Sequence, residues 1–219
     1  MKTAEEIYAE YRIMPSLQLH QLRVAAIAKR ICGNLKHSAN ENEVLLACLF
    51  HDMGNIIKSD LRYFSEFVEP EGLEYWQRVK NDFVEKYGSD HHHANVAIAR
   101  EIGLPARSIE LIRKIGFSQL RKVAADNALD RKIVQYADIR VGPHGVLSLR
   151  ERLFEGRERY TKTRNGRAYY ETDTEFQQLL SAAEELERQV MALSTITAAD
   201  ITDAAIAPSI EQLRERAVA

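Results

Sequence analysis

Cysteine, proline and glycine are scarce in this sequence. Its 219 residues include two cysteines, five prolines and ten glycines. Cys32 and Cys48 both fall within segments predicted to be helical, so we expect reduced core residues and not a disulfide framework. Few segments alternate between apolar and polar residues, whereas many place apolar residues at i, i+3 and i+4. This periodicity predicts an all-α fold.

Long apolar runs and a strong charge imbalance are absent as well. No apolar run approaches the roughly 20 residues needed to cross a membrane, and the segment MKTAEEIYAEYRIMP lacks the apolar stretch of a secretory signal. The net charge of −2 argues against a general nucleic-acid binder. We therefore expect a cytoplasmic protein with neither a membrane nor general nucleic acid as a partner.

Positive charge is nevertheless concentrated between residues 107 and 167. This stretch holds fifteen Lys or Arg residues against seven Asp or Glu residues. One explanation is a set of solvated helix faces, and another is a rim that attracts an anion. The composition leaves both interpretations open.

The most informative stretch is an apolar run that ends at His51 and Asp52. Residues 44–50 are apolar on every side, so a helix here is expected to be buried all round. Gly54 follows and is expected to end this helix. An ionised aspartate beside a buried helix is costly unless a cation or strong hydrogen bonds compensate it. The pair therefore indicates a metal site, provided that further ligands come from elsewhere.

Two more polar residues border predicted buried faces. His20 lies near the start of a long predicted helix, and Asp138 lies in a late one. Taken singly, each has a simpler explanation, as a satisfied helix histidine or a salt-bridged surface aspartate. Together with His51 and Asp52 they supply two imidazoles and two carboxylates, a set that suits Mn, Fe, Co, Ni, Zn or Mg. We therefore predict a divalent metal ion held by His20, His51, Asp52 and Asp138.

The order and surroundings of these residues resemble the H…HD…D signature of the HD-domain superfamily of metal-dependent phosphohydrolases. Four segments are similar to its motif helices: HQLRVAAIAKRI, LLACLFHDMGN, HHHANVAIAREIGLP and IVQYADIRV. The resemblance covers residues 16–145. It implies an HD-domain helical core, which we place at residues 1–165. Additional C-terminal helices over residues 166–219 are expected to pack on this core or to serve in dimerisation.

The sequence departs from the superfamily pattern at two places. Asn55 stands where many relatives carry a lysine or a glutamate, so Lys58 is expected to contact phosphate instead. Dinuclear relatives add two separated histidines before the last aspartate, but here no histidine lies between His93 and His144. A single metal ion is therefore favoured.

The resemblance implies that a metal-activated water hydrolyses a nucleotide or another small phosphoester. Asp52 would bind the metal and orient the water, and His91 would transfer a proton. Three successive histidines at 91–93 point about 100° apart on a helix, so they cannot all face one metal. The residues expected to contact the substrate are Arg23, Asn55, Lys58 and Arg140.

Two other functions remain open for this pattern. An HD-type oxygenase with a di-iron centre would need the second histidine that is missing here. A non-catalytic sensor or scaffold would use the bundle, and a metal, for structure, although the intact His51-Asp52 pair argues against it. An apolar stripe over residues 173–194 also leaves a homodimer as an alternative to packing on the core.

Overall fold

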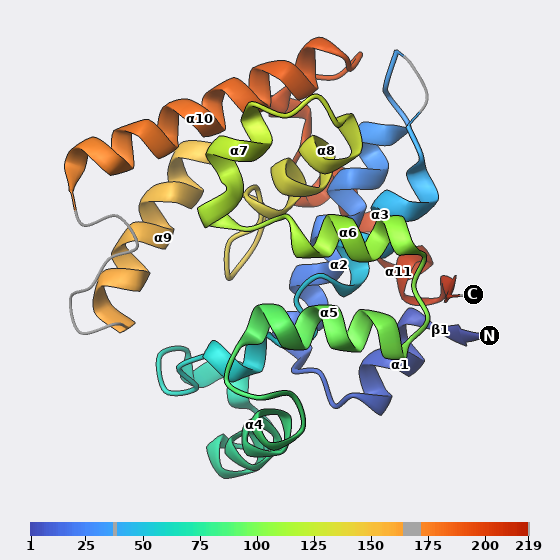
Figure 1. The fold of residues 1–219 in the computed structure, drawn as a ribbon, viewed down its shortest axis with the longest axis vertical. Helices are drawn as coiled ribbons and strands as arrows, with labels where there is room; N and C mark the ends of the chain where they lie inside the picture. The colour runs from blue at the N-terminus through green and yellow to red at the C-terminus, as the bar shows by residue number, and fades with distance from the viewer. Residues whose placement is uncertain (37–38, 164–171, 219) are drawn as a thin grey trace.

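The computed structural model describes residues 1–36, 39–163 and 172–218, and in these ranges the fold is almost entirely helical (Figure 1). This confirms the predicted all-α class. None of the described helices is both long enough and apolar enough to span a bilayer. The α-helices are α1 (Ala4–Glu10), α2 (Pro15–Cys32), α3 (Glu41–Phe50), α4 (Leu73–Tyr87), α5 (His91–Glu101), α6 (Ala106–Arg113), α7 (Leu120–Ala124), α8 (Leu129–Asp138), α9 (Leu149–Thr163), α10 (Asp173–Ala192) and α11 (Asp203–Arg214). The 3-10 helices are η1 (Asn55–Lys58), η2 (Ser65–Val68), η3 (Phe117–Gln119) and η4 (Ala198–Asp200), and strands β1 (Lys2–Thr3) and β2 (Ala217–Val218) pair antiparallel.

The helix α3 forms the centre of the bundle. Every residue from Val44 to Phe50 is buried, as expected for a helix that is apolar all round. It packs against α2, α6 and α8, and α2 in turn packs against α8 and α11. This arrangement brings the ends of α3 and α8 beside α2, where the predicted metal ligands lie.

A second group of elements covers the turn that follows α3. The helix α5 packs against η1 and α6, and α4 packs against η1, η2 and α5. The chain between η1 and η2 has no regular secondary structure and runs over the site. It supplies much of the wall of the cavity described below.

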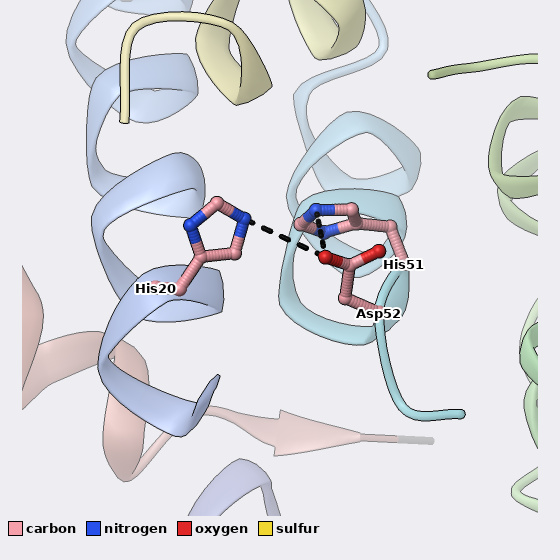
Figure 2. A group of neighbouring side chains, drawn as sticks. All are labelled: His20, His51 and Asp52. Carbon is pink, nitrogen blue, oxygen red and sulfur yellow. Dashed lines mark ion pairs between the residues drawn. The ribbon is translucent and has the colours of Figure 1, made fainter. Parts of the chain in front are cut away.

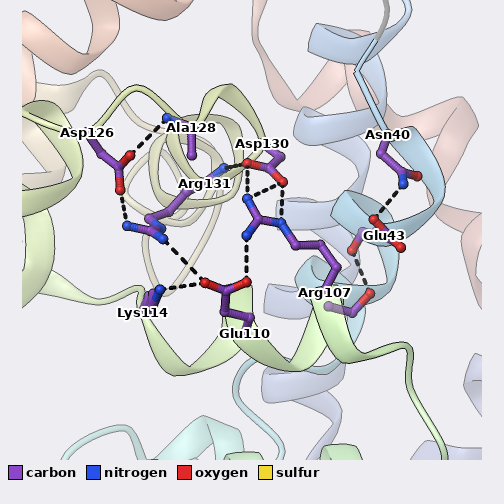
Figure 3. A network of polar contacts seen from close by, with 10 residues as sticks. Asn40, Glu43, Arg107, Glu110, Lys114, Asp126, Ala128, Asp130 and Arg131 are labelled. Carbon is purple, nitrogen blue, oxygen red and sulfur yellow. Dashed lines mark hydrogen bonds and ion pairs between the residues drawn. The ribbon is translucent and has the colours of Figure 1, made fainter.

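Charged residues join α6 to α8 on the outside of the bundle (Figure 3). Arg107 donates to the two carboxylate oxygens of Asp130 at 2.7 and 2.8 Å and to Glu110 at 2.6 Å. Lys114 and Arg107 together lower the pKa of Glu110 to about 2. Because α8 ends at Asp138, this network helps to fix a helix that carries a predicted metal ligand. Part of the positive charge between residues 107 and 167 is therefore explained by ion pairs on solvated helix faces.

The C-terminal helices pack on the rest of the chain. The helix α10 contacts α7, α8 and α9, and α11 contacts α1 and α2. Figure 1 shows α10 crossing the molecule beside α7 and α8. Six of the seven residues of the apolar stripe are buried in this packing, and Leu193 is exposed; the buried ones are Phe176, Leu179, Leu180, Ala183, Leu186 and Val190. The predicted boundary between residues 165 and 166 lies outside the described residues, and dimerisation stays a prediction.

Arg140 connects the end of α8 to this C-terminal part. Its side chain is buried, and it donates to the carbonyl oxygens of Leu147, Ala198 and Ile201 and to the hydroxyl of Tyr136. The helix α8 ends before this arginine, which frees its side chain to point toward η4 rather than along the helix. The guanidinium thus joins the end of α8 to the loop at Leu147 and to the segment 198–201.

Candidate metal centre

His20, His51, Asp52 and Asp138 come together from three elements, α2, the turn after α3, and α8. The Nε2 atom of His20 lies 3.7 Å from Asp52 Oδ2 and 3.3 Å from Asp138 Oδ1. The Nε2 atom of His51 lies 3.6 Å and 3.4 Å from the same two oxygens. Figure 2 shows the first three side chains facing one another. One ligand atom from each lies within 4.8 Å of the others. Ligands about 2.0–2.2 Å from a common ion lie at separations like the four imidazole–carboxylate distances. His20, His51 and Asp52 therefore form a group that could hold a metal ion, and Asp138 Oδ1 lies close to both imidazoles.

The ring of His51 is oriented for coordination. Its Nδ1 atom lies 2.8 Å from the carbonyl oxygen of Cys48, to which it donates. In the neutral ring the lone pair therefore lies on the Nε2 atom, which is buried without a hydrogen-bond partner. A buried polar atom of this kind is costly unless something binds it, and a backbone carbonyl behind the ring is a common support for a ligating histidine.

The electrostatics of the cluster favour positive charge at its centre. Burial lowers the pKa of His51, but the carboxylates of Asp52 and Asp138 outweigh it and raise that pKa to about 9. Burial likewise raises the pKa of Asp138, but the imidazoles of His20 and His51 hold it well below its usual range. A divalent cation would compete with these protons for the same lone pairs.

Two buried amides hold the turn that carries His51 and Asp52. The Oε1 atom of Gln21 accepts from the amide of Asp52 at 3.0 Å, and the Oδ1 atom of Asn95 accepts from the amide of Gly54 at 2.6 Å.

A Cβ on Gly54 would lie 2.5 Å from that of Ala94. The helix α3 ends at Phe50, so the prediction that Gly54 ends it is wrong. This glycine is instead explained by the close approach of α5.

A cavity of about 300 Å³ opens on the four candidate ligands. Part of its wall comes from η1, η2 and the chain between them, and part from α5, η3 and α9. Its aromatic lining residues are Tyr63, Phe64, Phe67 and Phe117, and its cationic ones are Lys58, Arg152 and Arg159. The cavity therefore combines flat apolar surfaces with positive charge.

The predicted substrate contacts are divided by the structure. Asn55 and Lys58 line the cavity, which is consistent with their predicted role. Arg23 and Arg140 are not among the described residues of its wall. Arg23 lies 3.2 Å from Asp203 of α11, and Arg140 is engaged by carbonyls of the C-terminal part. Neither arginine therefore faces this cavity, and their predicted contact with substrate stays untested.

The three successive histidines separate as the helical geometry requires. His91 and His92 line the cavity, whereas His93 is exposed and does not. Burial, Lys58 and His92 lower the pKa of His91 to about 4. Its imidazole is therefore neutral near pH 7.

Four residues of the site were missed by sequence reasoning: Gln21, Asn95, Arg152 and Arg159. The two amides are buried within helices, and they give no signal that separates them from ordinary polar residues. The two arginines lie seven positions apart on α9, hence on one face of the helix. They belong to the basic stretch for which an anion-attracting rim was one interpretation.

The comparisons with known proteins agree with this geometry. The model of the HD domain family matches residues 18–141, more than half of the chain. The comparison with curated proteins and that with solved structures gave no match. The matched range includes all four candidate metal ligands, while α9, α10 and α11 lie beyond it. The chain belongs to the HD domain family, whose superfamily is one of metal-dependent phosphohydrolases.

Proposed function

We propose that this protein is a phosphohydrolase that uses one divalent metal ion to hydrolyse a nucleotide or another small phosphoester. The buried Nε2 atom of His51, which has no hydrogen-bond partner and lies between two carboxylates, carries this proposal. His20, His51, Asp52 and Asp138 would hold the ion. When bound, it supplies a Lewis acid that polarises a phosphoryl oxygen and lowers the pKa of water.

The surrounding residues have distinct tasks in this proposal. Asp52 binds the ion and orients the attacking water, and the hydrogen bond from its backbone amide to Gln21 fixes its position. Lys58 is exposed at the cavity wall and neutralises phosphate charge. His91, neutral near pH 7, accepts a proton. Asn55, which lines the same wall, is available for a neutral hydrogen bond to the substrate.

The shape and lining of the cavity support a substrate of nucleotide size. Its volume, about 300 Å³, lies at the lower end of the usual range for small-molecule sites. Phe64 and Phe67, whose ring centroids are 4.8 Å apart, present apolar surfaces on which a base can stack. A small phosphorylated substrate and a cytoplasmic location complete the proposal.

A phosphatase panel with a metal-binding measurement tests it. Purified protein is assayed with Mn, Co, Ni or Mg against phosphomonoesters and phosphodiesters, and we expect hydrolysis with at least one metal. Asp52→Ala should lose both metal and activity while keeping its helical circular dichroism. Asp82→Ala is the control, because Asp82 is an exposed residue of α4 that pairs with Arg12.

Three results would contradict the proposal in different ways. Full activity and metal content in Asp52→Ala would show that the ligands are misassigned. Two irons per chain would favour the di-iron oxygenase. Bound metal without hydrolysis of any phosphoester would favour the non-catalytic scaffold.

A further inference from the structure

A buried amide side chain lines the cavity beside His91. Asn95 is 4% exposed and lies four residues after His91 on α5, and both residues line the cavity. Residues four apart on a helix are neighbours on one face. We propose that the Nδ2 group of Asn95 donates a hydrogen bond to a phosphoryl oxygen of the substrate. This inference rests on the proposed function, because it concerns the phosphate that reacts at the same site.

The orientation of the Asn95 amide is fixed by the turn that carries Asp52. The backbone N–H of Gly54 donates to this side chain at 2.6 Å, and only the oxygen of an amide group can accept it. The position of Oδ1 is therefore settled by the hydrogen bond. Because the amide group is planar, the two N–H bonds of Nδ2 are then fixed as well. The end of the side chain that is not bonded to the turn is a donor.

The Nδ2 atom opens on the cavity. It has no hydrogen-bond partner within the ranges 1–36, 39–163 and 172–218. Even so, it is not one of the partnerless atoms that are closed off from solvent, which include His51 Nε2 and Asn55 Oδ1. The atom is therefore accessible, and the open space that Asn95 lines is the cavity. A ligand that meets this nitrogen must supply an acceptor.

The place of Asn95 in the wall favours a phosphoryl oxygen as that acceptor. Its side chain is bonded to Gly54, two residues after Asp52, so the amide lies beside the candidate metal ligands. The reacting phosphate of the proposed function belongs at those ligands. The rings that suit a base, Phe64 and Phe67, come from another part of the wall, at η2. A fixed donor aimed at the reacting group needs no reorganisation as charge develops there.

Two substitutions separate this donor from the support of the turn. Asn95→Asp keeps an oxygen for the N–H of Gly54 but replaces the Nδ2 donor by an acceptor, whereas Asn95→Ala removes both. With Mn and a phosphoester that the wild type hydrolyses, kcat/KM of Asn95→Asp should fall about tenfold to a hundredfold, as for one lost hydrogen bond to a charged group. Its Mn affinity should not weaken. Asn95→Ala should lose Mn affinity as well as activity.

Ser118→Asp is the matched control for the added charge. Ser118 is exposed on η3 and lines the same cavity, so this substitution adds a carboxylate there and leaves the Asn95 donor in place. Its kcat/KM should fall far less than that of Asn95→Asp. Equal falls in the two variants would show that charge alone acts and would overturn the inference. An unchanged kcat/KM in Asn95→Asp would overturn it too, because Asn95 would then only support the turn.

Binding of inorganic phosphate distinguishes failure of this inference from failure of the proposed function. In isothermal titration calorimetry of the Mn-loaded protein, phosphate affinity should weaken about tenfold in Asn95→Asp and much less in Ser118→Asp. If the wild type hydrolyses no phosphoester, the proposed function fails, and the same calorimetry decides whether Asn95 binds phosphate. Equal affinities in the wild type and Asn95→Asp, or no binding by the wild type, would overturn the inference. Circular dichroism confirms that each variant is folded.

Discussion

Replacement of Gly54 by alanine should distort the turn that carries His51 and Asp52. The added Cβ would lie 2.5 Å from the Cβ of Ala94 and 3.0–3.1 Å from Oδ1 and the backbone nitrogen of Asn95. Carbon atoms in contact are normally about 3.5–4.0 Å apart, so the turn and α5 must separate by roughly 1 Å. This movement lengthens the hydrogen bond from Gly54 to Asn95, which is 2.6 Å.

The expected cost follows from the kind of contact. Overpacking of a well-packed interior costs about 1–3 kcal/mol, and we take about 2 kcal/mol because backbone atoms are involved. For a chain of this length each 1 kcal/mol lowers the melting temperature by about 2–4 °C. We therefore expect a fall of about 4–8 °C, together with weaker metal binding because Asp52 moves with the turn.

A matched glycine serves as the control. A Cβ on Gly33 would lie 3.4 Å from the carbonyl oxygen of Lys29, which is an ordinary separation, and the residue has φ −68°. Gly33→Ala should leave stability unchanged or raise it by about 0.4–1 kcal/mol. Thermal unfolding followed by circular dichroism, with calorimetry of Mn binding, measures both effects.

A double variant sharpens the test. Ala94→Gly removes the closest contact, so it should recover part of the loss when combined with Gly54→Ala, beyond the sum of the single effects. The reasoning is refuted if Gly54→Ala melts at the wild-type temperature and binds Mn unchanged. It is also refuted if Ala94→Gly gives no favourable coupling.

Three further predictions concern the supports of the site. Gln21→Leu leaves the backbone amide of Asp52 without its hydrogen-bond acceptor, so the free energy of unfolding should fall by about 1–3 kcal/mol. Calorimetry should also show weaker Mn binding. An unchanged free energy of unfolding together with unchanged Mn affinity would contradict this prediction. Arg107→Ala should lower the melting temperature by about 2–4 °C at pH 7, for a loss of about 1 kcal/mol. The pKa of Glu110 is lowered to about 2, so the stability that its ion pairs contribute is complete above its unfolded pKa and is lost as pH falls toward 2. The loss of melting temperature caused by Arg107→Ala should therefore be smaller at pH 3 than at pH 7. A larger loss at pH 3 would be inconsistent with these ion pairs. The pKa of His91 is lowered to about 4, so protonation of His91 should reduce kcat/KM only near pH 4. A decrease in kcat/KM centred near pH 6.5 that disappears in His91→Gln would show that the lowered pKa is wrong.

The sequence allowed the centre of the site to be predicted because strong local signals coincide there. The apolar run before His51 predicts a buried helix, and an ionised aspartate beside such a helix indicates a cation. His20 and Asp138 followed from their positions at the edges of apolar helix faces. The structure brings all four side chains together.

The roles of the arginines were not predictable in this way. Arg23 and Arg140 lie close in sequence to candidate ligands, but their side chains meet residues 203, 198 and 201, far along the chain. Arg152 and Arg159 reach the cavity only because of how α9 packs. Such contacts are set by tertiary packing, which helical periodicity does not specify.

The hydrogen bonds of Arg140 bear on whether the matched region can be excised as an autonomous folding unit. A fragment that stops at residue 165 would keep this guanidinium but lose the carbonyl acceptors of Ala198 and Ile201. Hydrogen bonds to a charged group contribute about 1.5–3 kcal/mol each, a large share of the roughly 5–15 kcal/mol that stabilises a typical domain. We therefore expect such a fragment to be less stable than the whole chain, and a graft of the candidate metal centre to need the C-terminal helices as well.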